Sequence, residues 1–222
     1  MDKLQRKLRP FGTVRSIKKG GGILFQGETP QSVMFVREGL VRAYTISSAG
    51  DEHIVALYGK GDLFPLAWAL DAAPGAMFYY DVLSDARVLA IPKQTFLEKV
   101  MNDKDIMASM LKFTANEYTS LLLRITGLEQ SKAIEKIAFT LYYLLLRHGT
   151  EKRPGIFTIN LKLSQLVIAN LVGLTRESTT KNLHILKKKG VITYRYSTYV
   201  VNRGKLEAFL DEDGFQDVNI TA

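Results

Sequence analysis

Three charged residues near the C-terminal end of the chain have the types and the spacing needed to bind the edges of base pairs. Arg176 and Glu177 are adjacent, and Lys181 follows four residues later, so on a helix all three can point outward from one end. Arginine and lysine donate hydrogen bonds to guanine O6 and N7, and glutamate accepts one from cytosine N4. An adjacent Arg–Glu pair on a helix is more often a surface ion pair, so the surrounding residues must decide between the two interpretations.

The surrounding sequence has the pattern of a helix-turn-helix. Gly173 supplies a sharp turn between two short helical segments, and Ser164 and Thr175 are suited to cap them. Ala169 is small where the two helices would cross closely, and Gly190 ends the second helix. The first turn of that second helix is therefore expected to face the major groove.

Further contacts with DNA are expected on both sides of this turn. Residues 191–201 have the alternation of a two-stranded β-hairpin, the wing of a winged helix-turn-helix. Contacts to phosphate, which position a protein without specifying sequence, are expected from Thr175, Ser178, Thr180 and Lys188.

The distribution of charge favours a polyanionic partner. The net charge is +8, and residues 160–205 carry nine basic residues against one acidic residue, so this segment accounts for all of it. A basic face of that density is typical of nucleic-acid binding. The alternative is a solvated surface that is offset by the acidic tail at 211–213.

The N-terminal part of the chain has the pattern of short strands. Between about residues 13 and 92, segments such as 33–36, 40–46 and 53–58 are rich in β-branched and aromatic residues. Glycines separate them at intervals of mostly 11–12 residues, and residues 47–51 have the composition of a hairpin loop. This spacing predicts an all-β sandwich or barrel.

From residue 103 the period changes to that of a long helix, with Asp103 or Asp105 at its N-terminus. Seven a and d positions follow with 4-3 spacing: Met107, Leu111, Thr114, Tyr118, Leu121, Ile125 and Leu128. The seam predicts pairing with a second copy of the chain, and packing against the strand domain is the alternative. A second helix is predicted over 131–147, then a polar loop over 149–155.

This order of parts resembles the Crp–Fnr superfamily of regulators from about residue 20 to residue 201, most specifically over 172–179, 59–64 and 27–39. The resemblance implies an α+β fold with an N-terminal double-stranded β-helix (β-roll) over 1–100. A dimerisation helix over 101–128 and a C-terminal winged helix-turn-helix over 129–222 would follow. It also implies a homodimeric transcriptional regulator that binds double-stranded DNA.

By this resemblance, Arg176, Glu177 and Lys181 occupy the base-reading positions, and the implied half-site resembles TGTGA in an inverted repeat. Lys181 replaces an arginine of the cyclic-AMP-binding members, which weakens the expected readout of its guanine. Gln165 replaces an arginine that contacts phosphate in those members. By analogy alone, the loop at 151–155 would contact RNA polymerase.

The effector site departs from that of cyclic-AMP binders. Those proteins carry a Gly–Glu pair soon after Gly61, an Arg–Ser pair further on, and a Thr–Ser pair on the long helix. The corresponding positions here are 65–66, approximately 78–79, and 121–122, and none keeps those polar residues. Leaving the polar groups of the nucleotide unpaired costs about 1–3 kcal/mol each. We therefore predict that cyclic AMP does not bind tightly.

The residues at and around these positions suggest a pocket for an apolar or aromatic effector, with Arg42 or Arg124 facing an acidic group. The lining would be Phe64, Leu66, Trp68, Phe78, Tyr79, Tyr118, Leu121 and Leu122. The alternative is a collapsed core without ligand, which would make the protein an effector-independent regulator.

Other classes of function find little support. The chain has no cysteine, which excludes an iron–sulfur cluster, and its three scattered histidines, His53 included, argue against a metal site or haem. No catalytic constellation, signal peptide or membrane span is evident, so we expect a cytoplasmic protein that is not an enzyme. The remaining rival is a dimeric ligand-binding signalling module with no DNA role.

Overall fold

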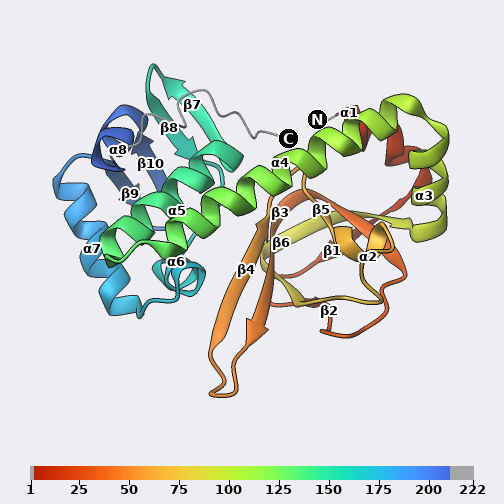
Figure 1. Ribbon diagram of the computed structural model, residues 1–222, viewed down its shortest axis with the longest axis horizontal. Coiled ribbons are helices and arrows are strands. Elements are labelled where there is room, and N and C mark those ends of the chain that lie inside the picture. The colour runs from red at the N-terminus through yellow and green to blue at the C-terminus, as the bar shows by residue number, and fades with distance from the viewer. Residues whose placement is uncertain (1–2, 211–222) are drawn as a thin grey trace. The chain divides into compact units, whose positions relative to one another are not determined.

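The computed structural model describes residues 3–210, so the acidic tail at 211–213 lies outside them. The chain forms two units, one up to Thr114 and one from Ala115. The first contains α1 (Lys3–Leu8), η1 (Arg9–Phe11), β1 (Thr13–Ile17), β2 (Gly22–Leu24), β3 (Ser32–Ile46), β4 (Glu52–Tyr58), β5 (Leu63–Phe64), α2 (Leu66–Ala69), β6 (Tyr79–Pro92) and α3 (Lys93–Asn102). Helix α4 (Lys104–Glu129) continues into the second unit (Figure 1). There it is followed by α5 (Ala133–His148), β7 (Gly149–Arg153), β8 (Ile156–Ile159), α6 (Gln165–Val172), α7 (Arg176–Lys188), β9 (Ile192–Arg195), β10 (Thr198–Asn202) and α8 (Arg203–Leu210).

Two long antiparallel strands form the frame of the first unit. β3 and β6 pair from Ser32 opposite Pro92 to Tyr44 opposite Tyr79, in a sheet of order β1-β6-β3-β4. The segments 33–36 and 40–46, expected as separate strands, are one strand, because register shifts around Gly39 bend it without ending it. Gly39 has φ +86°, and a Cβ there would lie 2.4 Å from the carbonyl oxygen of Asp85, so only glycine fits.

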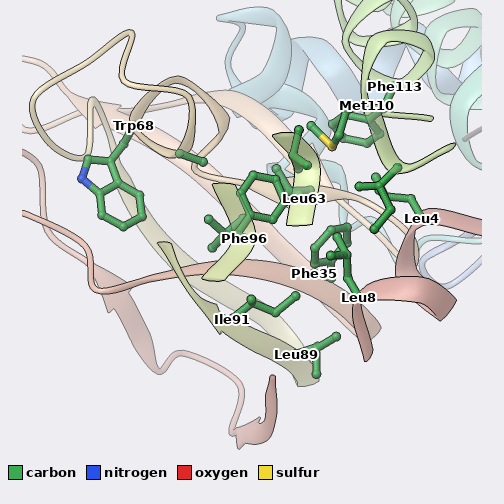
Figure 2. Packing of buried hydrophobic residues seen from close by; sticks show 14 residues of the cluster. Leu4, Leu8, Phe35, Leu63, Trp68, Leu89, Ile91, Phe96, Met110 and Phe113 are labelled. Atoms are coloured by element: carbon green, nitrogen blue, oxygen red, sulfur yellow. The ribbon is translucent and has the colours of Figure 1, made fainter. Parts of the chain in front are cut away.

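Alternate residues of β3 enter two apolar clusters. Met34 and Val36 belong to a cluster with Phe64 and Tyr80. Phe35 belongs to the other, which joins the sheet to α1, α3 and the first half of α4 through Leu4, Leu8, Phe96, Met110 and Phe113 (Figure 2). The sequence predicted neither α1 nor α3, because each is short and takes its stability from this cluster rather than from a long periodic face.

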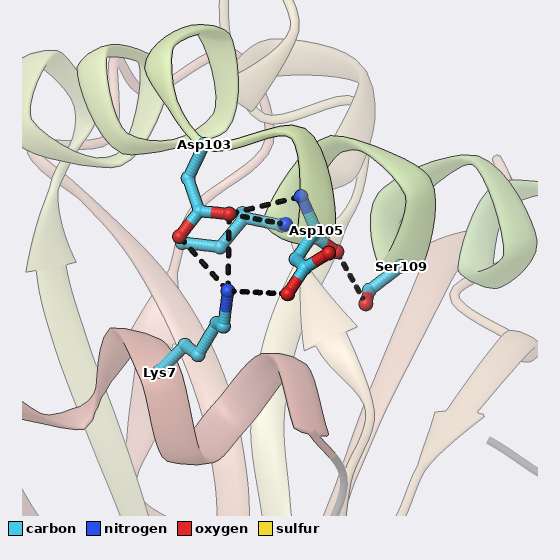
Figure 3. A network of polar contacts seen from close by, with 5 residues as sticks. Lys7, Asp103, Asp105 and Ser109 are labelled. Atoms are coloured by element: carbon cyan, nitrogen blue, oxygen red, sulfur yellow. Dashed lines mark hydrogen bonds and ion pairs between the residues drawn. The ribbon is translucent and has the colours of Figure 1, made fainter.

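A network of polar contacts surrounds the N-terminus of α4, where the sequence predicted Asp103 or Asp105 (Figure 3). Asp103 Oδ1 accepts hydrogen bonds from the backbone N–H of Asp105 at 2.9 Å and of Ile106 at 3.1 Å. Lys7 Nζ of α1 donates to both carboxylate oxygens of Asp103 at 3.0 Å and to Asp105 at 3.1 Å. The hydrogen bond from Lys7 is the largest cause that lowers the pKa of Asp103, and the backbone hydrogen bonds lower it further. The hydrogen bonds to the carboxylates of Asp103 and Asp105 raise the pKa of Lys7.

In the second unit, helix α5 is the apolar centre, and every residue from Ile137 to Leu146 is buried. A four-stranded sheet has the order β7-β8-β10-β9. The prediction of a polar loop over 149–155 was therefore wrong: these residues form β7 and its turn, with Gly155 at φ +73°. The Pro154–Gly155 pair is a turn signal that could have located this hairpin.

Candidate nucleic-acid interface

The predicted caps set where the two helices of the helix-turn-helix begin. Ser164 Oγ accepts a hydrogen bond from the N–H of Val167 at 3.2 Å, and Thr175 Oγ1 accepts one from the N–H of Ser178 at 3.2 Å. Gly173 ends α6 at φ +67°, in the left-handed region that favours glycine. These contacts confirm the caps and the turn, and they place Arg176 and Glu177 in the first turn of α7.

The first turn of α7 borders a hollow of about 770 Å³. The three residues predicted to contact bases lie in its lining together with residues that precede or follow them in the helix-turn-helix. It is lined by Gln165, Thr175, Arg176, Glu177, Thr180 and Lys181. The side chains of Arg176, Glu177 and Lys181 are all exposed. Among residues 3–210, neither Arg176 nor Glu177 forms an ion pair, so the surface-pair interpretation does not describe them. The hollow thus has two cations and one carboxylate available to a ligand.

One hydrogen bond links the two helices at this hollow. Thr180 Oγ1 donates its proton towards Gln165 Oε1 at 2.6 Å and the carbonyl oxygen of Arg176 at 2.8 Å. Phosphate oxygens only accept hydrogen bonds, so the expected phosphate contact of Thr180 requires its hydroxyl to leave these partners. The amide nitrogen of Gln165 is the group left to donate outward.

The other predicted phosphate contacts lie at different places. Ser178 is partly buried, and its carbonyl accepts from Asn182 at 2.8 Å. Lys188 is exposed in the last turn of α7, about 18 Å along the helix from Arg176. Lys188 therefore lies outside the hollow, at the opposite end of the helix.

The wing is formed as predicted. Strands β9 and β10 pair with Arg195 opposite Thr198, so two residues, Tyr196 and Ser197, make the turn between them. Lys187 Nζ of α7 lies 5.2 Å from the ring centroid of Tyr194 on β9. The sequence interpretation did not single out Tyr196, although a two-residue turn without glycine was a signal that could have identified it.

Helix α4 has two apolar faces. Ile106, Met110 and Phe113 are buried in the core of the first unit. The predicted seam is different: Leu111 and Tyr118 are 68% and 63% exposed, and Met107, Thr114, Leu121 and Ile125 are also exposed, whereas Leu128 is partly buried. Packing within the chain therefore involves other residues than the seam, which stays open in the single chain.

The predicted effector residues are distributed over several environments. Phe64 and Phe78 belong to the cluster of Met34, whereas Leu66 and Trp68 belong to that of Phe35. Tyr79 stacks on Tyr44 with ring centroids 5.5 Å apart. On α4, Leu121 and Leu122 are exposed.

The expectation that Arg42 faces an acidic effector needs correction. Its Nε and Nη2 donate to the two carboxylate oxygens of Asp81 at 2.7 and 2.8 Å, and its Nη1 donates to Glu52 at 2.5 Å. These two carboxylates raise its pKa against the effect of burial and already neutralise its charge. The other candidate, Arg124, donates to the carbonyl oxygen of Leu171 at 3.2 Å.

Within residues 3–210, no group of three or more His, Asp or Glu side chains is placed to hold a metal ion. In the same part of the chain, no helix is long and apolar enough to cross a bilayer.

Comparisons with known proteins agree with this architecture. The chain matches the family models of a cyclic nucleotide-binding domain over residues 14–103 and a Crp-like helix-turn-helix domain over residues 135–209. It is 28% identical over 186 residues to the regulatory protein HlyX of Actinobacillus pleuropneumoniae, with 82% of this chain and 75% of that protein covered. It is 26% identical over 211 residues to the cyclic AMP receptor protein of Thermus thermophilus, with coverage of 95% and 88%.

Solved structures show the same fold. FixK2 from Bradyrhizobium japonicum matches with a TM-score of 0.74 at 23% identity, and covers 89% of this chain and 96% of that one. A CooA mutant from Carboxydothermus hydrogenoformans matches with a TM-score of 0.74 at 21% identity, with coverage of 92% and 90%. The predicted α+β fold, with an N-terminal β domain, a long helix and a C-terminal helix-turn-helix, is confirmed.

Proposed function

The chain belongs to the Crp–Fnr superfamily of transcriptional regulators, and on this premise we propose that it acts as a homodimer on an inverted DNA repeat. The proposed half-site resembles TGTGA. The observation that carries the proposal is the hollow at the start of α7, where Arg176, Glu177 and Lys181 are exposed together. The protein acts by binding rather than by catalysis, in line with the regulatory relatives.

Within the half-site, the three side chains have distinct roles. Arg176 donates two hydrogen bonds to guanine O6 and N7, Glu177 accepts one from cytosine N4, and Lys181 donates to a second guanine. Thr175 and Ser178 contact phosphate beside the first turn. The amide nitrogen of Gln165 contacts the phosphate that an arginine contacts in the cyclic-AMP-binding members, because the amide oxygen of Gln165 already accepts a hydrogen bond from Thr180.

The proposed dimer forms along α4. Leu111, Tyr118, Leu121 and Ile125 follow heptad spacing and are exposed in the single chain, so pairing with a second copy would remove them from water. A two-fold dimer of this kind presents two copies of α7 about 34 Å apart, one turn of DNA.

Regulation of this dimer does not use cyclic AMP in our proposal. The positions of the family's nucleotide-binding pairs hold apolar or aromatic residues here, and Arg42 is already paired with Asp81. An apolar or aromatic effector and effector-independent binding are the two remaining forms of the proposal, and calorimetry with cyclic AMP and with aromatic acids separates them. The hairpin of β7 and β8, at 151–155, is the proposed contact with RNA polymerase.

Fluorescence anisotropy with a labelled duplex that carries the inverted repeat tests the function. We expect the affinity to fall steeply as salt rises, and to exceed the affinity for a scrambled duplex about 1,000-fold or more. A protein that binds neither duplex, or whose binding does not respond to salt, would instead support the signalling-module alternative.

A further inference from the structure

The first helix of the helix-turn-helix ends without a cation of its own. The last four carbonyl groups of an α-helix have no partner within the helix, and the negative end of the helix dipole lies there. Helix α6 carries no basic residue in its last turn. The carbonyl oxygen of Ala169 accepts from the N–H of Gly173, and from that of Leu174 at 3.1 Å. A cation from another element would therefore stabilise the carbonyls that follow Ala169.

Arg124 of α4 provides this cation. Its Nη2 donates a hydrogen bond to the carbonyl oxygen of Leu171 at 3.2 Å, although the two residues are 47 positions apart in the sequence. Arg124 is partly buried and Leu171 is buried. A charged donor makes a stronger hydrogen bond than a neutral one, and burial protects the bond from screening by salt. The guanidinium thus fixes the end of α6 to α4.

This contact lies close in the chain to the first turn of α7. Three residues separate Leu171 from Thr175, whose hydroxyl caps α7. Arg176 and Glu177 follow the cap directly. Because so short a connection has little reach, a shift of the end of α6 also shifts the start of α7. The position of α6 on α4 therefore sets where Arg176 and Glu177 point.

The same arginine borders the exposed seam of α4. With Leu111, Tyr118 and Ile125 at the a positions of the heptad, Arg124 occupies a g position. Residues at g flank the apolar seam between two paired helices. The seam residues next to Arg124, Leu121 and Ile125, are exposed in the single chain. Arg124 therefore reaches the end of α6 from the border of the proposed dimer interface.

We propose that Arg124 is a positioning residue that fixes the direction of α7 relative to the dimer seam. The inference rests on the proposed function, because it requires a dimer whose two copies of α7 bind one inverted repeat. Arg124 makes no contact with DNA in this arrangement. Its hydrogen bond to Leu171 ties the distance between the two copies of α7 to the paired α4 helices. The consequence is a strong preference for one spacing between the two half-sites.

Half-site spacing is a readout that a merely structural role of Arg124 would not change. Three duplexes are compared: a single half-site, the inverted repeat with half-site centres one turn of DNA apart, and the same repeat lengthened by two base pairs, about a fifth of a turn. Arg124→Gln removes the charge, and Arg124→Lys keeps it. Lys112→Gln is the matched control, because it removes one positive charge from an exposed position of α4 outside the seam.

Fluorescence anisotropy with the full chain measures the affinities. We expect the wild type to bind the repeat with one-turn spacing about 100-fold more tightly than the lengthened repeat. Arg124→Gln should reduce this preference about tenfold, the effect of losing one charged hydrogen bond, and Arg124→Lys should retain most of it. Lys112→Gln should keep the wild-type preference. All four proteins should bind the single half-site alike and remain dimers in sedimentation velocity.

The proposal is overturned if Arg124→Gln keeps the wild-type preference for spacing. It is also overturned if this variant loses as much affinity for the single half-site as for the repeat, since Arg124 would then act only on the folding of the helix-turn-helix. A monomeric Arg124→Gln would place its role in the dimer contact instead. A wild type that binds no duplex, or binds both repeats equally, contradicts the proposed function before any variant is compared, so the two failures are distinguishable.

Discussion

Adjacent residues in the first turns of α7 differ sharply in their surroundings. Arg176, Glu177 and Lys181 are exposed, whereas Thr179 and Leu183 are fully buried against the rest of the unit. The 3.6-residue period of the helix separates the two sets, which is why the sequence could assign both faces. The role of each exposed side chain can therefore be tested without disturbing the core.

Arg176→Ala should weaken binding to the inverted repeat by about 1–3 kcal/mol and leave non-specific binding nearly unchanged, because it removes a base contact. Lys188→Ala is the control: as a phosphate contact it should weaken both kinds of binding alike and lower the salt slope by about one. Anisotropy titrations on specific and scrambled duplexes measure both. Equal losses on the two duplexes for Arg176→Ala would make Arg176 a phosphate contact.

Thr179 presents a different kind of test. Within the described part of the chain, its hydroxyl is buried without a hydrogen-bond partner, as is that of Tyr199, whose pKa burial raises to about 12. Thr179→Val keeps the shape and removes the unpaired polar group, so the free energy of unfolding should stay constant or rise by up to about 1 kcal/mol.

Urea denaturation of Thr179→Val measures this effect. Thr180→Val is the matched control, because it removes a hydroxyl that is bonded to Gln165 at the exposed hollow. Its effect should appear in DNA binding rather than in stability. A clear loss of stability in Thr179→Val would show that the buried hydroxyl has a partner.

At the scale of elements, the start of α4 depends on an N-terminal helix that the sequence pattern did not predict. Lys7 of α1 pairs with Asp103 and Asp105, while Leu4 and Leu8 of the same helix are buried beside Met110 and Phe113. The capping role of Asp103 was visible from the sequence. Its ion pair with Lys7, 96 residues away, was not.

This network makes a prediction about pH. Because folding lowers the pKa of Asp103, its ion pair stabilises the fold fully above the ordinary carboxyl pKa of about 4 and is lost as the pH falls through the lower, folded value. Lys7, whose pKa is raised, contributes below its ordinary pKa and loses its effect only as the pH rises through the raised value.

Asp103→Asn keeps an oxygen for the backbone N–H of Ile106 but loses the charge. The gap in unfolding free energy between the wild type and Asp103→Asn should be larger at about pH 7 than at about pH 2, where the aspartate is protonated. Urea denaturation at the two pH values measures it. An equal gap at both values would show that the charge of Asp103 does not contribute.

At the scale of the whole molecule, the exposed apolar seam of α4 predicts an interface with a second copy of the chain, because burial would remove it from water. The double variant Leu121→Asp, Ile125→Asp should convert the protein to a monomer, because four charges in the dimer would face each other in an apolar seam. The affinity for the full inverted repeat should fall, since two linked helix-turn-helix domains bind more tightly than one.

Sedimentation velocity measures the oligomeric state of this variant. Met101→Asp is the control, because Met101 is 63% exposed and lies on α3, outside the seam. It should stay dimeric and bind DNA normally. A seam variant that remains a dimer, or a wild type that is a monomer at all concentrations, would overturn the assignment of α4 as the dimer helix.

The sequence alone determined the helix-turn-helix, its caps, the wing and the start of α4, because each depends on residues within about one or two helical turns of each other. Tertiary structure decided what depends on distant residues. It joined 33–36 and 40–46 into one strand through pairing with β6, ordered α1 on a shared core, and closed 149–155 into a hairpin against β8. It also paired Arg42 with Asp81, which removed a predicted effector contact. Long-range pairing and burial stabilise these features, and neither leaves a local period in the sequence.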